Sequence, residues 1–234
     1  MEQSVKLLPE KELIWSPIVA NSNMNRKRNA SGVNSYAQEI RFEPEQFLKN
    51  FIEEYGRVKW LDLCCGQGNA LLQSARYLEN QKLQNKASLT GIDLVNYFTS
   101  TPKHIYCVHF EVSSLLNWTK IEKYDLITCI HGLHYVGDKL STLKKYLAML
   151  SPNGHFTANL DLKSIHIENH NTSKFLQPIF EENHISYNSK TKMIECIGTK
   201  IIEFGVQYLG ANDKAGPNYT GQEAVDSYYI IKSP

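Results

Sequence analysis

Residues 58–69, VKWLDLCCGQGN, join a short apolar run to a turn that contains two closely spaced glycines. Such a run, bounded by glycines, is typical of a buried parallel strand. The residues that follow place Leu71, Leu72, Ala75 and Leu78 at helical spacing, which predicts a helix directly after the turn. A glycine-rich turn between a strand and a helix lets a ligand approach bare backbone amides at the helix N-terminus.

The same alternation of apolar and helical segments continues along the chain. Further strand-like runs cover residues 87–94, 104–112, 124–133 and 155–162. A helical pattern covers residues 138–150, between the last two runs. Strands that alternate with helices predict a doubly wound, Rossmann-like α/β sheet with right-handed crossovers. Ligands of such sheets bind at the carboxyl ends of the strands. The segments where we therefore look for function are residues 62–69, 93–96, 111–114 and 131–135.

Two segments flank this alternating pattern. Residues 198–210 and 224–232 are both strand-like with no helix between them, which predicts an antiparallel hairpin at the sheet edge. Before the first strand, residues 43–56 have helical spacing and follow a polar stretch. The sequence therefore predicts an N-terminal helical lid or cap, residues 1–56, and a main ligand-binding domain, residues 57–234.

The composition limits the classes of partner. Hydrophobic residues make up 42% of the chain and the net charge is +1, so no strong field recruits nucleic acid or an anionic membrane. No apolar segment approaches the ~20 residues that span a bilayer, and the charged N-terminus does not read as a signal peptide. These features predict a cytoplasmic protein that has no membrane partner and is a monomer or a homodimer.

The five cysteines, at positions 64, 65, 107, 129 and 196, raise the question whether a thiol supplies the chemistry. Their number is odd, and no CxxC spacing indicates a zinc site. In a reducing cytosol a buried cysteine behaves as a small hydrophobic residue. We therefore interpret the cysteines of the turn as small residues that fill space, and its glycines as the functional part.

The stretch LDLCCGQG resembles the first motif of class I S-adenosylmethionine-dependent methyltransferases, in which an acidic residue precedes small residues and Gly-x-Gly. Asp62, Gly66 and Gly68 match this motif position by position. The alternative, a dinucleotide fingerprint G-x-G-x-x-G, fails because Leu71 occupies the third glycine position. One motif does not identify a family, so the motifs that follow it along the chain are needed as well.

Further motifs of the same family follow in order. Asp93 ends the second strand, where a carboxylate can accept both ribose hydroxyls. Glu111 stands at the usual acidic position beside the adenine, and MLSPNGHF before the fifth strand is close to the family's Leu-x-Pro-Gly-Gly. The resemblance covers residues 55–162 by motif and the tail by topology. It implies a seven-stranded, mostly parallel sheet that ends in an antiparallel C-terminal hairpin.

The resemblance also implies a function. The expected enzyme moves the methyl group of S-adenosylmethionine to an O, N, S or carbon atom of a small molecule and releases S-adenosylhomocysteine. The residues that it implies for cofactor binding are Tyr36, Asp62, Cys64, Gly66, Gly68, Asp93, Leu94, Glu111, Val112 and His131.

The stretch HGLHY, just past the fourth strand, supplies two candidate bases, His131 and His134. A base is needed only when the acceptor keeps its proton at pH 7, and histidine titrates near neutrality. The alternative is that both rings simply pack, on the cofactor or on the next helix. The candidate substrate-binding residues are Arg26, Tyr135, Asn218 and Tyr219. Metal binding is not predicted, and Asn159 and Asp161 are the residues that a magnesium site would use.

Three alternatives stay open at this point. The first two are an RNA and a protein methyltransferase, and the third is a protein of the same fold that binds the cofactor without methylating. The motif Asn/Asp-Pro-Pro-Tyr of exocyclic-amine methyltransferases is absent, and the nearly neutral charge argues against a duplex partner. The intact glycine turn and Asp93 favour real cofactor binding. The identity of the methyl acceptor cannot be predicted from these patterns.

Overall fold

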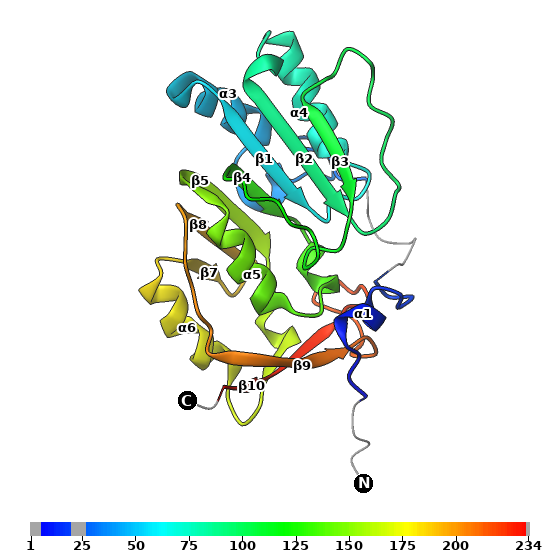
Figure 1. The fold of residues 1–234 in the computed structure, drawn as a ribbon, viewed down its shortest axis with the longest axis vertical. Coiled ribbons are helices and arrows are strands. Elements are labelled where there is room, and N and C mark those ends of the chain that lie inside the picture. The colour runs from blue at the N-terminus through cyan, green and yellow to red at the C-terminus, as the bar shows by residue number, and fades with distance from the viewer. Residues whose placement is uncertain (1–5, 20–26, 233–234) are drawn as a thin grey trace.

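The computed structural model of the chain describes residues 6–19 and 27–232. Its main element is a seven-stranded sheet in the order β3-β2-β1-β4-β5-β8-β7 (Figure 1). The parallel strands are β1 (Val58–Leu63), β2 (Ala87–Asp93), β3 (Val108–Val112), β4 (Tyr124–Cys129) and β5 (Leu150–Asn159). β8 (Met193–Ile197) runs antiparallel to both β5 and β7 (Ser186–Asn188). The predicted Rossmann-like sheet, mostly parallel with one antiparallel hairpin, is confirmed.

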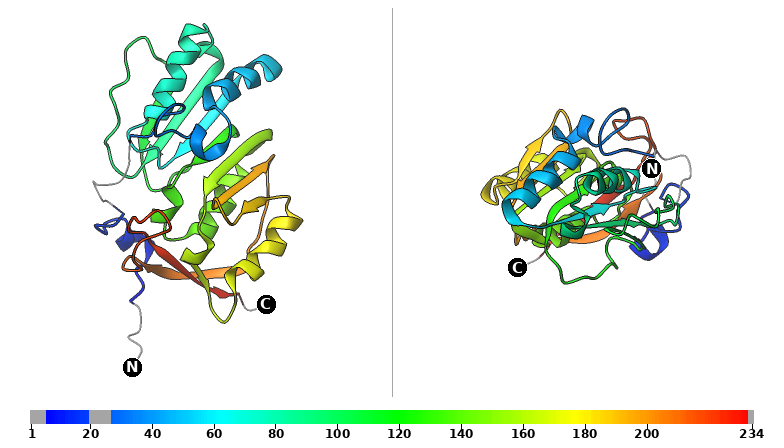
Figure 2. Two further views of the ribbon diagram at one scale, coloured as in Figure 1. Left: turned by 180° about the vertical axis from the view of Figure 1, so that it is seen from behind. Right: turned by 90° about the horizontal axis from the view of Figure 1, so that it is seen from above.

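Helices cover both faces of this sheet (Figures 1 and 2). α3 (Pro44–Tyr55) and α4 (Asn69–Asn80) pack on one face, and α5 (Lys139–Ala148) and α6 (Thr172–Glu182) belong to the core of the other. Successive strand residues alternate between these cores: Trp60 contacts the first and Leu61 the second, and both are fully buried. Because both faces are covered, the strands read as continuous apolar runs in the sequence.

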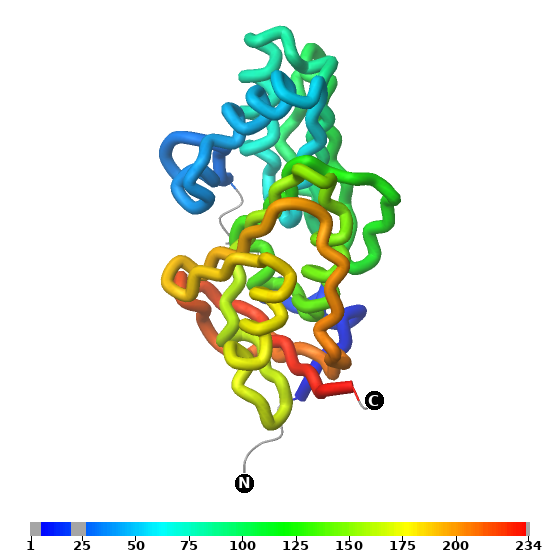
Figure 3. Tube along the Cα trace, turned by 90° about the vertical axis from the view of Figure 1, so that its left-hand side faces the viewer, coloured from blue at the N-terminus to red at the C-terminus, as the bar shows by residue number. Residues whose placement is uncertain are grey.

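The predicted place of the C-terminal hairpin is wrong. β9 (Val206–Asn212) and β10 (Asp226–Ile231) do pair antiparallel, but they form a separate three-stranded sheet with β6 (Ile165–Ile167). Figure 3 shows these last strands at the end of the molecule opposite α4. The edge of the main sheet is taken by β8 and β7 instead. Strands of three to five residues carry too little alternation to be recognised from sequence.

The N-terminal residues contact two parts of the molecule. α1 (Glu10–Leu13) lies beside β9, and Leu8 forms a bridge with Ala211 (Figure 1). Further along, Ala30 donates its backbone N–H to Gln73 Oε1 of α4 at 2.9 Å, and α2 (Ala37–Ile40) follows. Both segments approach the carboxyl ends of the parallel strands. Within the described residues, no helix has the length and apolar character needed to span a bilayer.

Candidate functional site

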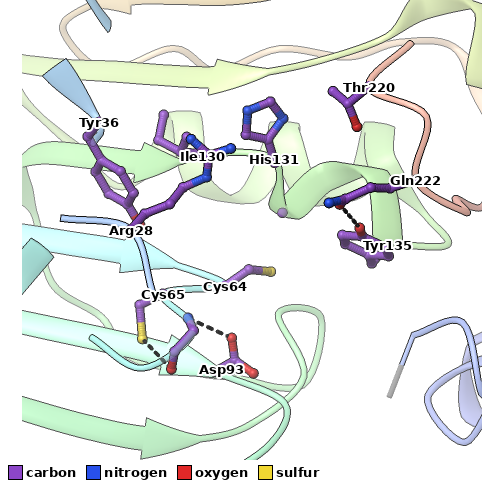
Figure 4. Close-up of a pocket in the computed structure, with 12 residues that line it drawn as sticks. Arg28, Tyr36, Cys64, Cys65, Asp93, Ile130, His131, Tyr135, Thr220 and Gln222 are labelled. Carbon is purple, nitrogen blue, oxygen red and sulfur yellow. Dashed lines mark hydrogen bonds between the residues drawn. The ribbon is translucent and has the colours of Figure 1, made fainter. Parts of the chain in front are cut away.

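Two cavities lie next to each other at the carboxyl ends of the parallel strands, where the sequence predicted the site. Cys64, Asp93 and Tyr135 line both cavities, which therefore adjoin and are together called the cleft. Their empty volumes, including the parts open to solvent, are about 640 Å³ and 540 Å³. Figure 4 shows the first cavity, with Tyr36 on one side and Gln222 on the other.

The structure brings about half of the predicted site residues to this cleft. Those that line it are Tyr36, Cys64, Gly66, Asp93, Leu94, His131 and Tyr135. Those that line neither cavity are Asp62, Gly68, Glu111, Val112, His134, Asn218 and Tyr219. Arg26 lies outside the described residues. Arg28, Thr220 and Gln222, which are sequence neighbours of predicted residues, line the first cavity.

The glycine-rich turn is shaped by left-handed backbone at three positions, Cys64 (φ 55°), Gly66 (φ 60°) and Gly68 (φ 74°). The turn is held against β2, because Cys65 N donates to Ile92 O at 3.0 Å. Gly68 is the N-cap residue of α4. The turn thus presents the backbone of Gly66 to the cleft, as expected for a glycine-rich ligand loop.

Asp93 anchors the middle of the cleft. Its Oδ2 accepts from Gly66 N at 2.9 Å and its Oδ1 accepts from Val95 N at 3.1 Å. Asp93 lines both cavities, and a carboxylate oxygen can accept more than one hydrogen bond. A ribose diol supplies the donors that such an acceptor needs. On this observation the residues present fit S-adenosylmethionine.

Asp62, predicted beside the cofactor, lies instead behind the cavity wall. Tyr36 Oη donates to Asp62 Oδ2 at 2.9 Å, and Thr128 Oγ1 donates to Asp62 Oδ1 at 2.6 Å. Trp60 Nε1 donates in turn to Thr128 Oγ1 at 2.8 Å. The carboxyl group is fully buried, and this burial raises its pKa to about 7. Asp62 therefore positions Tyr36, which itself lines the first cavity.

Replacing this carboxyl group should change how stability depends on pH. Since the ordinary pKa of 3.8 is lower than the folded value of about 7, the unfolded chain releases this proton first, and stability falls as pH rises between these values. Asp62→Asn, whose amide can donate to Tyr36 Oη, should raise the free energy of unfolding by about 1 to 2 kcal/mol at pH 8. Urea unfolding at pH 5 and pH 8 measures this. If the free energy of unfolding changed between pH 5 and pH 8 by the same amount in Asp62→Asn as in the original chain, the raised pKa of Asp62 would be contradicted.

His131 lies two residues after the end of β4 in a left-handed conformation, with φ 59°. Its backbone N donates to Asn159 Oδ1 at 2.9 Å, and its Nε2 lies 3.0 Å from Glu39 Oε1. The bond with His131 is the main cause that lowers the pKa of Glu39. The sequence predicted neither the contact of Glu39 with His131 nor that of Asn159. Both residues lie far from His131 in the sequence, and no motif relates their positions to it.

His134, the second predicted base, is only 1% exposed, and neither ring nitrogen has a hydrogen-bond partner among the described residues. Burial lowers its pKa to about 3, so the ring is neutral near pH 7. Tyr219 packs on it edge to face, with 5.4 Å between ring centroids. In this conformation His134 lies beneath the loop that carries Tyr219, away from the cleft.

The other predicted residues make local contacts. Glu111 accepts from Trp118 Nε1 at 2.8 Å and pairs with Lys120, so its side chain is engaged away from both cavities. The neighbouring Val112 is exposed.

The loop that follows β9 forms the wall opposite Tyr36 in the first cavity (Figure 4). Asn218 Oδ1 accepts from Thr220 N at 2.8 Å, which closes a turn within the loop. Tyr135 Oη donates to Gln222 Oε1 at 2.9 Å and ties the loop to the residues after β4. Asn218 therefore shapes the loop, while Thr220 and Gln222 present their side chains to the cavity.

The two residues considered for magnesium have other partners. Asn159 Oδ1 accepts from His131 N, and Asp161 Oδ1 accepts from Lys163 N at 3.2 Å and lies 3.6 Å from Lys192 Nζ. Across the described part of the chain, no group of three or more His, Cys, Asp or Glu side chains is arranged to hold a metal ion.

The sequence matches a family of known proteins and has relatives of known name. The family model described as a methyltransferase domain matches residues 23–197. The ubiquinone biosynthesis O-methyltransferase of Vibrio parahaemolyticus is 26% identical over 190 residues, which is 74% of this chain and 75% of that protein. The protein of the same name in Vibrio vulnificus is 25% identical over the same shares.

A structural relative has also been solved. The N-methyltransferase NodS of Bradyrhizobium japonicum, in complex with S-adenosylhomocysteine, is 16% identical. The comparison covers 82% of this chain and 98% of that one, with a TM-score of 0.46. The segment that the family model matches includes the glycine-rich turn, Asp93 and both histidines after β4.

Proposed function

The chain belongs to the methyltransferase domain family, and we propose that it transfers the methyl group of S-adenosylmethionine to a small molecule. The observation that carries the proposal is the cleft at the strand ends, in which Asp93 and the turn around Gly66 face two adjoining cavities. When bound, S-adenosylmethionine supplies an activated methyl group, so the protein has mainly to align the acceptor and exclude water.

The cofactor divides between the two cavities. Asp93, at their junction, holds the ribose hydroxyls. The second cavity, lined by Leu94, Ser113 and Ser114, receives the adenine. The first cavity, lined by the backbone of Gly66 and the ring of Tyr36, receives the methionine end. With the cofactor bound in this way, its methyl group would lie beside the residues that follow β4.

The acceptor binds in the rest of the first cavity. Its walls there are Arg28, His131, Tyr135, Thr220 and Gln222. The N-terminal segment and the loop after β9 bound this space, which suits a small molecule and supports the role of residues 1–56 as a lid. The Vibrio relatives are O-methyltransferases by name, which supports an oxygen acceptor here. We place the protein in the cytoplasm on its composition alone.

Two measurements test the proposed function. Calorimetry should show that the purified chain binds S-adenosylhomocysteine. A turnover screen against a panel of small hydroxyl, amine and thiol compounds, read by mass spectrometry, should show one product that is heavier by a methylene group. A folded chain that binds neither S-adenosylmethionine nor S-adenosylhomocysteine would falsify the proposal.

The cysteine at the cleft should be dispensable. Cys64 lines both cavities, but its bond with Cys129 and its burial raise the pKa of its thiol well above the ordinary value. A thiol that stays protonated is a poor nucleophile. In Cys64→Ala, the affinity for S-adenosylhomocysteine and the turnover rate should therefore stay within about threefold of those of the original chain. The control is Cys107→Ala, away from the cleft, which should give the same result. Loss of turnover with intact affinity would show that the thiol reacts.

A further inference from the structure

The contact between Glu39 and His131 joins the N-terminal segment to the residues after β4, and His131 lines the acceptor cavity. His131 Nε2 lies 3.0 Å from Glu39 Oε1, and the two side chains are only 16% and 29% exposed. Arg28 Nη1 lies farther away, 3.4 Å from the same oxygen. An ionised carboxylate only accepts hydrogen bonds, so Nε2 is the donor and carries the proton of the ring.

The other ring nitrogen of His131, Nδ1, is not held by the described part of the protein. Nδ1 makes no hydrogen bond with a described residue and is not buried, whereas both ring nitrogens of His134 are. Figure 4 shows the His131 ring between Arg28 and Thr220, on the wall of the cavity. A neutral imidazole that donates from Nε2 has a lone pair on Nδ1. The pair with Glu39 therefore leaves a proton acceptor on a residue that lines the acceptor cavity.

The backbone of His131 is fixed as well. A residue other than glycine with φ near +60° is strained, and such residues persist only where the surroundings hold them. Here the bond from His131 N to Asn159 Oδ1 holds the backbone, while Glu39 holds the ring. Backbone and side chain are thus positioned from two different elements, β5 and α2.

We propose that Glu39 is a positioning residue that holds His131 as a base with its Nδ1 free, and that the methyl acceptor is a hydroxyl compound. This inference rests on the proposed methyl transfer. The acceptor oxygen bonds to the methyl carbon as the carbon–sulfur bond breaks and leaves its electron pair on sulfur. The O–H proton passes to Nδ1 and the O–H electron pair stays on oxygen. Glu39 stabilises the imidazolium until it releases the proton to solvent.

The need for a base selects the acceptor class. An aliphatic amine is mostly protonated at pH 7, but once it has lost that proton to water it presents a lone pair and needs no base for the attack. A thiol with an ordinary pKa near 8.5 ionises readily. An alcohol or a phenol, by contrast, keeps its proton at pH 7 and gains most from a positioned base. A cavity that contains a histidine supported by a carboxylate therefore fits a hydroxyl acceptor best.

The pairing can be tested without any ligand, by NMR of the full chain labelled with ¹⁵N-histidine. The His131 signals are assigned by their loss in His131→Gln. We expect long-range ¹H–¹⁵N correlations to place the proton on Nε2, with an Nε2–H signal that the carboxylate protects from exchange with water. Glu39→Ala should lose this protected signal, and Glu39→Gln, which keeps an acceptor oxygen, should retain it. A proton on Nδ1, or an unchanged signal in Glu39→Ala, would overturn the pairing.

Glu43→Ala is the matched control, because Glu43 is an exposed residue of the same segment whose side chain makes no capping bond. It should leave the His131 signals and the turnover unchanged. With a hydroxyl acceptor from the screen, Glu39→Ala should lower kcat about tenfold to a hundredfold, a part of what a general base contributes. Glu39→Gln should lie between, and KM should change little in both.

The outcomes separate this inference from the proposed function. If the original chain binds no S-adenosylhomocysteine, the proposed function fails, while the NMR spectra still decide whether Glu39 and His131 pair. If it binds and methylates amines or thiols but no hydroxyl compound, the acceptor class is wrong. If the NMR pairing stands and Glu39→Ala keeps full kcat, the role as a base is wrong.

Discussion

Asp93→Ala is expected to weaken the binding of S-adenosylhomocysteine about tenfold or more. Hydrogen bonds to a charged group contribute roughly 1.5 to 3 kcal/mol, and about 1.4 kcal/mol corresponds to a factor of ten in affinity. The structure adds a second cause, because Asp93 Oδ2 also holds the N–H of Gly66 in the turn. Isothermal titration calorimetry measures the loss, and circular dichroism checks that the variant is folded.

Glu111→Ala is the matched comparison, since both carboxylates were predicted at the cofactor but only Asp93 lines the cleft. The side chain of Glu111 is occupied by Trp118 and Lys120. We therefore expect Glu111→Ala to change the affinity by less than about threefold. A larger loss for Glu111→Ala than for Asp93→Ala would show that Glu111 turns toward the adenine when the cofactor binds.

What could be predicted from the sequence is what the chain encodes locally. The strand, the turn with Gly66 and Gly68, and the start of α4 lie within a dozen residues, so glycine spacing and apolar periodicity reveal them together. Asp93 follows from the rule that ligands gather where parallel strands end. These two facts place the cleft without any knowledge of the rest of the fold.

What could not be predicted depends on contacts between distant segments. Glu39 meets His131 across 92 positions of the sequence, and Tyr36 reaches Asp62 across 26. Neither pair has a spacing that distinguishes it from any other polar pair. Glu111 differs for another reason: the chain after β3 turns back, so Trp118 Nε1 donates to the carboxylate that the motif assigned to a ligand. Motif position fixes the backbone of a residue but not the direction of its side chain.

Gly68→Ala should lower the free energy of unfolding by about 2 to 5 kcal/mol, more than any other variant proposed for this chain. The left-handed backbone at Gly68, φ 74°, costs a residue with a Cβ roughly 1 to 2 kcal/mol. The new Cβ would also lie 2.2 Å from Cε1 and Cζ of Phe110. That ring is stacked on Phe98 with 4.8 Å between centroids, so it cannot swing aside without losing contacts. Overpacking of this kind costs about 1 to 3 kcal/mol.

Gly56→Ala separates the two costs. Gly56 has φ 84°, and no heavy atom beyond its chain neighbours lies within 4 Å of a Cβ built there, so this variant measures the backbone cost alone. In urea unfolding the excess loss at Gly68 is then the steric cost of Phe110. In a chain that already carries Phe110→Ala, adding Gly68→Ala should cost little more than Gly56→Ala does, because the ring that the new Cβ would meet is gone. A double-mutant cycle measures this coupling between the two residues. Equal losses for Gly56→Ala and Gly68→Ala would show that Phe110 moves aside freely, and the glycine would then be needed only for its backbone conformation.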